Sequence, residues 1–95
     1  MKTTRNTPYA KKKESEETYQ ENTRIDRRLK IETRFGYAVR KYRIEGQLTQ
    51  ADLAHKCKYH QNYISDIESG KRNVTLRVAE TVAKALGVQV KDLLT

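Results

Sequence analysis

The sequence predicts an all-α domain, a compact bundle of five helices over residues 31–95, preceded by a basic arm over residues 1–30. Three observations support this fold class. Apolar residues after position 30 recur at intervals of three and four, the spacing of one buried helix face. Thr and Gly stand where these runs begin and end, positions at which they favour helix capping. No segment alternates polar and apolar residues over the length of a strand.

The first helix is expected over residues 33–45, with Gly46 ending it. Its buried face consists of Phe35, Val39 and Tyr42. Ile25 and Leu29 lie four positions apart, and this spacing would let the helix begin earlier, within the charged segment that precedes it.

The second helix is expected to begin at Thr49 and to run for about two turns. The Thr49 hydroxyl can accept a backbone N–H, while Asp52 places a carboxylate in the positive first turn. Its narrow apolar stripe consists of Ala51, Leu53, Ala54 and Cys57. Because a helix this short is unstable alone in water, packing against other helices must hold it.

The third helix is expected to begin near His60 and to end by Glu68, with Gly70 beyond it as a left-handed residue. Ile64 and Ile67 form its core face. Its other face is a polar stripe, made of Gln61, Asn62, Ser65, Asp66 and Ser69. Amides can bind adenine through its N6 donor and N7 acceptor, so the polar stripe is suited to reading base edges. An ordinary solvated surface is the alternative.

Thr75 and Gly87 bound a fourth helix, as its N-cap and its stop. The buried face of that helix consists of Leu76, Ala79, Val82, Ala83 and Leu86. A short fifth helix follows, with apolar residues Val88, Val90, Leu93 and Leu94. We expect Leu93 to close the core. The residues available to meet a second subunit are Leu94, Val90 and Val78, and the alternative is scattered exposed apolar residues, which are common.

Two short helices joined by a tight turn, the second with a polar face that packing does not require, describe a DNA-reading helix-turn-helix. The charge agrees with this interpretation. The chain holds 20 Lys and Arg against 12 Asp and Glu, and its net charge of +8 favours a polyanion. Charge alone would equally suit RNA, a membrane surface or an acidic protein. Because one short helix reads too few bases for genomic specificity, we expect a homodimer on double-stranded DNA, with recognition helices about 34 Å apart.

Residues 35–94 resemble the Cro/CI-type (XRE-like) helix-turn-helix domain of phage repressors and small bacterial regulators, which implies the lambda-repressor-like fold. The matching segments are FG at 35–36, VRKYR at 39–43, TQADLA at 49–54, YISDIESGKRN at 63–73 and KALGVQVKDLL at 84–94. Within this family, YIS at 63–65 combined with RNVTL at 72–76 most resembles the controller proteins of restriction-modification systems.

The resemblance implies a role for each matched polar residue. Gln50 would hold a DNA phosphate. The residues at base-reading positions are Gln61, Asn62, Ser65 and Asp66, with Ser69 on the same polar stripe. The clamps on the DNA backbone would be Lys71, Arg72 and Asn73. Arg43 and Glu68 match a salt bridge that fixes the recognition helix, and losing one partner would strand the other charge.

Four further residues lie in or next to the predicted recognition helix. His60, at the start of the recognition helix, is a candidate phosphate contact. Tyr63 has two interpretations, a phosphate contact through its hydroxyl or a ring at the edge of the core. Lys58 occupies the turn position usually taken by Gly, where a Cβ disfavours the left-handed conformation, so a slightly reshaped or mildly strained turn is expected. Asp66 would repel phosphates, and it would either accept a hydrogen bond from cytosine N4 or discourage binding to wrong sites.

We expect no enzymatic function. The sequence has no Gly-rich phosphate loop, no nucleophile with a recognisable base and no carboxylate cluster, so neither a catalytic residue nor a cofactor is predicted. His55 and Cys57 point in divergent directions on a helix, a turn intervenes before His60, and structural zinc takes four ligands. No metal site is therefore predicted, and Cys57 is assigned to the core. Without a membrane span or a signal peptide, we expect a cytoplasmic bacterial or phage protein on the nucleoid, with no membrane partner and no small-molecule effector domain.

Residues 1–30 hold nine basic and five acidic side chains and few apolar ones, so they cannot bury a core and we expect a disordered arm. The arm would follow phosphates or enter a minor groove, or it is merely a solvated tail. The leading hypothesis is a sequence-specific transcription regulator on a palindromic operator, a restriction-modification controller by its resemblance. The second hypothesis is a protein-binding adaptor of the same fold, a bridging coactivator or an antitoxin, whose arm engages a protein partner.

Overall fold

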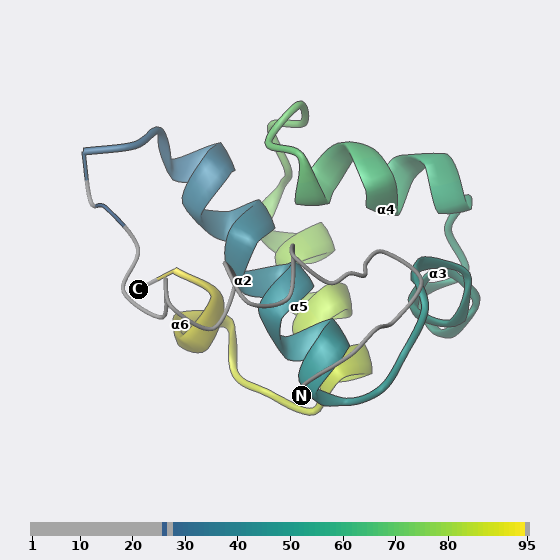
Figure 1. The fold of residues 1–95 in the computed structure, drawn as a ribbon. Coiled ribbons are helices and arrows are strands. Elements are labelled where there is room, and N and C mark those ends of the chain that lie inside the picture. Colours follow the sequence, from purple (N-terminus) through teal and green to yellow (C-terminus); the bar gives the residue numbers. More distant parts are fainter. Residues whose placement is uncertain (1–25, 27, 95) are drawn as a thin grey trace, which may run out of the picture.

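The computed structural model describes residue 26 and residues 28–94, so most of the predicted arm lies outside the described residues. The described part contains helices and no strand. In chain order these are α2 (Ile31–Glu45), α3 (Gln50–Cys57), α4 (Gln61–Glu68), α5 (Leu76–Leu86) and α6 (Val90–Leu93). The predicted all-α bundle of five helices is therefore confirmed (Figure 1).

The core lies where all five helices meet. The long helix α2 packs against α4, α5 and α6, while α3 packs against α4 and α5. The buried apolar residues are Phe35, Ala38, Val39, Leu53, Ala54, Cys57, Ile64, Ile67, Ala79, Val82, Ala83 and Leu93. Helix α4 contributes only Ile64 and Ile67 to this set, so most of its surface lies along one edge of the molecule, at the top right of Figure 1.

Helix α2 begins at Ile31, two residues before the predicted start, and the suggested extension through Leu29 is wrong. A turn replaces it. The Leu29 N–H donates to the Asp26 carbonyl over 3.0 Å, and the Arg28 N–H donates to Asp26 Oδ1 over 2.9 Å. Asp often competes with helices in this way, because its short side chain offers neighbouring N–H groups another acceptor.

The C-terminus of α2 lies at Glu45, as predicted, but the left-handed residue comes one position later than the glycine. Gly46 has φ −85°, whereas Gln47 has φ 62°. The Leu48 N–H then bonds to the Arg43 carbonyl over 3.0 Å, which satisfies a carbonyl that the helix leaves free. The chain thus turns towards α3 on a non-glycine residue.

The predicted caps of α3 and α5 are confirmed. The Asp52 N–H donates to Thr49 Oγ1 and the Thr49 N–H donates to Asp52 Oδ2, both over 2.9 Å. The hydrogen bond from the Thr49 backbone N–H to the carboxylate, and after it the Thr49 side chain, lower the pKa of Asp52 below its usual value of 3.8. Thr75 accepts from the Val78 N–H over 3.1 Å, and Gly87 ends α5 with φ 76°.

Two residues assigned to buried faces are exposed instead. Ala51 lies outside the stripe that α3 turns to the core, because its position on the helix is well over a quarter-turn from Leu53 and Cys57. Leu76 shares a face with Ala83, but it is the first residue of α5 and extends past the core, so 83% of it is exposed. Predicting burial from periodicity fails at such ends because it assumes a neighbour along the whole helix.

Within residues 28–94, no helix combines the length and the hydropathy needed to cross a bilayer.

Candidate nucleic-acid interface

The turn between α3 and α4 keeps the geometry that a glycine would give. Lys58 has φ 63° and ψ 39°, a left-handed residue. The Tyr59 N–H bonds to the Ala54 carbonyl over 2.9 Å, and the Lys58 N–H bonds to the His55 carbonyl over 3.2 Å. This pattern of two hydrogen bonds ends helices with a left-handed residue. The turn is therefore not reshaped, and Lys58 bears the steric cost of its Cβ.

A buried ion pair connects α2 to the last residue of α4. Arg43 Nε lies 2.6 Å from Glu68 Oε2 and Arg43 Nη2 lies 3.1 Å from Glu68 Oε1, and the two side chains are only 2% and 3% exposed. Arg43 Nη1 also donates to the Leu48 carbonyl over 2.8 Å. The structure thus contains the salt bridge that the resemblance implies. A buried charge without its partner is expensive, so this pair ties the end of α4 to α2.

Gln50 joins the same network from the start of α3. Its Nε2 donates to Glu68 Oε1 over 3.1 Å. An amide carries two N–H protons, so one proton of Gln50 is left for an acceptor outside the protein. The side chain expected to hold a phosphate is therefore positioned by the residue that also pairs with Arg43.

The backbone of α2 lies directly against the end of α4. A Cβ on Gly36 would come within 2.8 Å of the Glu68 carbonyl oxygen, a distance that real Cβ atoms essentially never show. Gly70, with φ 79°, lies against Thr33 in the first turn of α2. These contacts place α4 and the loop after it at one edge of the bundle, next to the start of α2.

The structure places the polar stripe of α4 on the side away from Ile64 and Ile67. Gln61 and Asn62 are exposed, and Ser65 and Asp66 are partly buried. Ser69 is exposed, but its hydroxyl donates to the carbonyls of Ser65 and Asp66 over 3.0 and 3.2 Å. Its proton therefore remains within the helix end, and only its lone pairs are available to a partner.

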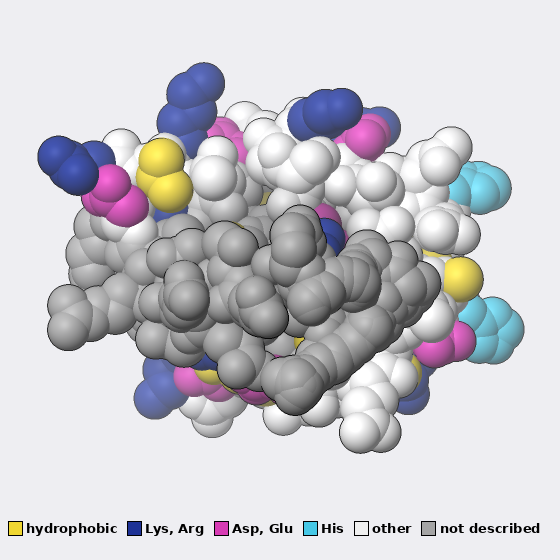
Figure 2. Space-filling view, viewed as in Figure 1, with side chains coloured by type: hydrophobic (Ala, Val, Ile, Leu, Met, Phe, Trp, Pro, Cys, Tyr) yellow, Lys and Arg dark blue, Asp and Glu magenta, His cyan; other side chains and the backbone are white. Residues whose placement is uncertain are grey.

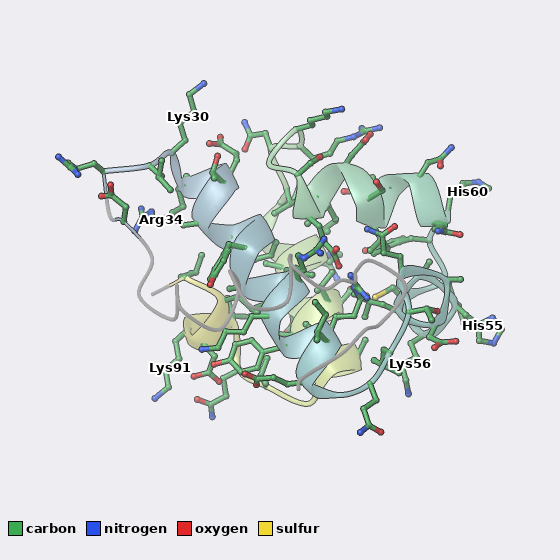
Figure 3. The ribbon with its side chains drawn as sticks, in the orientation of Figure 1. Lys30, Arg34, His55, Lys56, His60 and Lys91 are labelled. Atoms are coloured by element: carbon green, nitrogen blue, oxygen red, sulfur yellow. The ribbon has the colours of Figure 1, made fainter. Side chains whose placement is uncertain are left out.

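The three expected backbone clamps follow directly on Gly70 and are exposed: Lys71, Arg72 and Asn73. In Figure 3, Lys30 projects at the same edge from the start of α2, and His60 projects from the N-terminal end of α4. Figure 2 shows Lys and Arg side chains along this upper edge, with acidic side chains beside them. The edge thus combines amides on a helix with cations on the loop that follows.

One contact at this edge escaped the sequence prediction. Arg72 Nε lies 3.4 Å from Asp66 Oδ2, and the Arg72 guanidinium carbon lies 5.1 Å from the centre of the Tyr63 ring. The Tyr63 ring also packs edge-on against Tyr59, with 5.1 Å between ring centres. Tyr63 therefore lies at the edge of the core. The spacing of Asp66 and Arg72 crosses a helix end, where helical periodicity carries no signal.

The structure brings no metal site together among the described residues. In Figure 3, His55 projects outward from α3 and His60 from the position just before α4, whereas Cys57 is buried in the core, as predicted. Burial raises the pKa of the Cys57 thiol above its ordinary value. His60 is exposed at the N-cap position of α4 and makes no side-chain capping bond there.

Several known proteins are similar to this chain. The helix-turn-helix family profile matches residues 39–93. The chain is 52% identical over 61 residues to control protein C.BamHI of Bacillus amyloliquefaciens, a match that covers 63% of this chain and 75% of that protein.

Two solved structures of restriction-modification controller proteins are also similar. C.AhdI from Aeromonas hydrophila is 31% identical with a TM-score of 0.63, over 65% of this chain and 94% of that one. The C.Esp1396I tetramer in complex with its natural 35 base-pair operator is 32% identical with a TM-score of 0.60, over 68% of this chain and 96% of that one.

Proposed function

This chain belongs to the helix-turn-helix family of DNA-binding transcription regulators and is similar to restriction-modification controller proteins. We propose that it binds a palindromic operator as a dimer and controls a restriction-modification operon. The observation that carries the proposal is the exposed polar stripe of α4 beside a cationic loop, on a helix that a buried ion pair holds in place. The protein would act in the cytoplasm, on the nucleoid, and we assign it no catalytic step.

In this proposal Gln61, Asn62 and Ser65 read base edges. The two exposed amides can each make a bidentate contact with adenine in the major groove. Asp66 and Ser69 lie on the same face, with Ser69 restricted to accepting hydrogen bonds. Reading is thus concentrated in the first turn and a half of α4, which enters the groove first in helix-turn-helix proteins.

The DNA backbone would be held at both ends of α4. His60 lies at the start of α4, whereas Gln50 meets Glu68 at the end of α4 and keeps one N–H free for a phosphate. The clamps after α4 are Lys71, Arg72 and Asn73. Tyr63, whose ring packs between Tyr59 and Arg72, would reach a phosphate only through its hydroxyl. Contacts on both sides fix the register of the helix, while base contacts supply the sequence information.

An apolar groove supports the proposed dimer. It has a volume of about 220 Å³ and lies between the start of α2, the loop over residues 72–75, the start of α5 and α6. Its apolar lining consists of Ile31, Phe35, Val74, Leu76, Ala79, Val90 and Leu94. Ile31, Leu76 and Leu94 are among the most exposed large apolar residues of the described chain. A symmetric dimer through this groove would bury them and pair two recognition helices on successive major grooves.

The experiment that tests this function compares variants of the polar stripe on two DNAs. Sites are first selected from random duplex DNA with the intact protein. Gln61→Ala and Asn62→Ala should each weaken binding to the selected site by about 1–3 kcal/mol, because each amide loses a base contact, and should leave binding to random DNA nearly unchanged.

The control is Glu45→Ala, which removes an exposed side chain at the other end of α2 from the Gly70 contact and should alter neither affinity. Equal losses on selected and random DNA would overturn the base-reading assignment. Failure to select any site would overturn the proposed function itself.

A further inference from the structure

An acidic side chain lies in the middle of the surface that we assign to DNA. Asp66 belongs to the polar stripe, and its side chain is 36% exposed. A carboxylate brought near phosphates is repelled, so a position on this face normally disfavours one. The structure places a cation beside this carboxylate, since Arg72 Nε lies 3.4 Å from Asp66 Oδ2. The ion pair offsets the negative charge of Asp66.

Arg72 is held on two sides. Its guanidinium carbon lies 5.1 Å from the centre of the Tyr63 ring, within reach of a cation–π contact, while its Nε faces the carboxylate. The backbone adds a third constraint, because the Lys71 N–H donates to the Asp66 carbonyl over 2.9 Å. Arg72 is nevertheless 52% exposed, so it stays accessible to DNA from its resting position.

Because of this ion pair, two cations of the loop should contribute differently to non-specific DNA binding. Lys71 and Arg72 are neighbours in the same exposed loop, but the structure pairs Arg72 with a carboxylate and, among the described residues, gives Lys71 no acidic partner. A cation that is already neutralised releases few counterions when it meets a phosphate, so it adds little to non-specific binding. Lys71 should contribute its full charge on every DNA sequence.

The carboxylate also limits which base it tolerates. It can accept a hydrogen bond from the amino group of cytosine N4 or adenine N6, whereas guanine O6 and thymine O4 offer it only another acceptor. When a base amino group donates a hydrogen bond to the Asp66 carboxylate and replaces Arg72 there, the Arg72 guanidinium becomes free to bind a phosphate. On other sequences the ion pair persists and Arg72 stays neutralised.

From this geometry we propose that Asp66 and Arg72 form a selectivity latch, an ion pair that suppresses non-specific binding and opens only where the operator presents an amino group to Asp66. The latch rests on the proposed function, because it presumes that α4 enters the major groove. Asp66 is then the residue that determines specificity at one base pair of each half-site, and Arg72 converts that contact into affinity.

The first test measures how binding to random DNA depends on salt. Lys71→Gln should flatten the slope of log K against log salt by about 0.9, whether or not it is combined with Asp66→Asn. Arg72→Gln should change the slope little on its own. In the Asp66→Asn background, where the guanidinium is released, adding Arg72→Gln should flatten the slope by about 0.9 relative to Asp66→Asn alone. The latch is wrong if, in the otherwise unaltered protein, Arg72→Gln flattens the slope as much as Lys71→Gln does.

The second test repeats site selection. Sites selected by the intact protein should carry cytosine or adenine at one position of each half-site, on the strand that faces Asp66. Asp66→Asn should abolish the preference for cytosine there and should lower the ratio of specific to non-specific affinity about ten-fold or more. Glu45→Gln, which removes one exposed negative charge far from this loop, should leave the ratio unchanged.

The outcomes separate the two proposals. If the intact protein prefers a site and Asp66→Asn leaves both the selected base and the ratio unchanged, the latch is wrong and the proposed function stands. If the intact protein prefers no site, both are wrong. Asp66 and Arg72 are partly exposed, so circular dichroism should show that these variants fold like the parent protein.

Discussion

Lys58 shows how one residue sets the geometry of the candidate interface. Its left-handed backbone turns the chain from α3 into α4, and two hydrogen bonds depend on that turn. The left-handed conformation brings Cβ close to the following carbonyl oxygen, which costs about 1–2 kcal/mol for a residue other than glycine. The Lys58 side chain is exposed, so packing within the described part of the chain does little to offset this cost.

Lys58→Gly should therefore stabilise the domain. The relief of backbone strain exceeds the extra freedom that glycine gives the unfolded chain, so we expect the free energy of unfolding to rise by about 0.5–1 kcal/mol. Urea denaturation followed by circular dichroism measures this change. Lys58→Ala is the matched control, since it removes the same charge and keeps the Cβ, and it should leave stability nearly unchanged. A gain of the same size in Lys58→Ala would assign the effect to charge.

Arg43 and Glu68 form a buried ion pair, in which each charge depends on the other. The pair is almost fully buried, and Gln50 and the Leu48 carbonyl complete its hydrogen bonds. Such a pair adds less stability than its geometry suggests, because both charges have left water. Its structural effect is positional, since it joins α2, the start of α3 and the end of α4 at one point.

At the scale of the element, α3 depends on its first turn. Eight residues are too few for a stable isolated helix, and the reciprocal bonds of Thr49 and Asp52 satisfy two N–H groups there. The backbone hydrogen bond from Thr49 and the side-chain bond lower the pKa of Asp52. A lowered pKa in the folded state stabilises the fold above the unfolded pKa, and the stabilisation is lost as the pH falls through the folded value.

The stabilisation supplied by Asp52 should consequently decrease as the pH falls. The melting temperature of the parent protein should exceed that of Asp52→Asn at neutral pH, and the difference should shrink as the pH falls from about 5 towards about 2. Thermal unfolding followed by circular dichroism across this range measures both curves. A difference that stays constant over the range, or grows towards acid, would show that the carboxylate does not stabilise α3 through its charge.

Helix α4 combines a firmly held interior with a free outer face. Ile64 and Ile67 are fully or almost fully buried, Gly36 lets α2 approach its last turn, and the ion pair holds Glu68. Its outward residues carry no such packing. Substitutions on the outer face should therefore change DNA binding with little effect on folding, which makes the variants of Gln61, Asn62 and Asp66 informative.

At the scale of the whole molecule, the apolar groove and the polar stripe lie on different parts of the surface. The groove uses the starts of α2 and α5, α6 and the loop over residues 72–75, which includes the clamps Arg72 and Asn73, whereas the stripe belongs to α4. This separation allows a second copy to bind without covering α4. Leu76 is the most informative residue of the groove, because 83% of it is exposed and the monomer gains little from it.

Leu76→Glu should weaken the proposed dimer without unfolding the monomer. Fully burying a leucine contributes about 1.5–3 kcal/mol, and a symmetric interface counts it twice, so the dimer dissociation constant should rise about 100-fold or more. Sedimentation equilibrium measures the change. Leu29→Glu provides the control, since Leu29 is also exposed but does not line the groove. Unchanged dimerisation in Leu76→Glu would exclude this groove as the interface.

Local chemistry made much of the fold predictable. The capping bonds of Thr49 and Thr75 span three residues, and the left-handed Gly70 and Gly87 end helices within one turn, so short sequence windows contain the whole signal. The same holds for the buried Ile64 and Ile67, which follow from helical periodicity. The family resemblance added the Arg43 and Glu68 pair, which no local rule would find.

By itself the sequence determined the helices, their order, most of the core face of each and the family, because hydrogen bonding and periodicity act over a few residues. Only the tertiary structure decided that Leu76 is exposed, that Gln50 donates to Glu68 and that Asp66 pairs with Arg72. Each of these depends on how a helix end meets a segment that periodicity does not place beside it. Whether a side chain is covered, and by what charge it is paired, is a property of the packed molecule and not of any one helix.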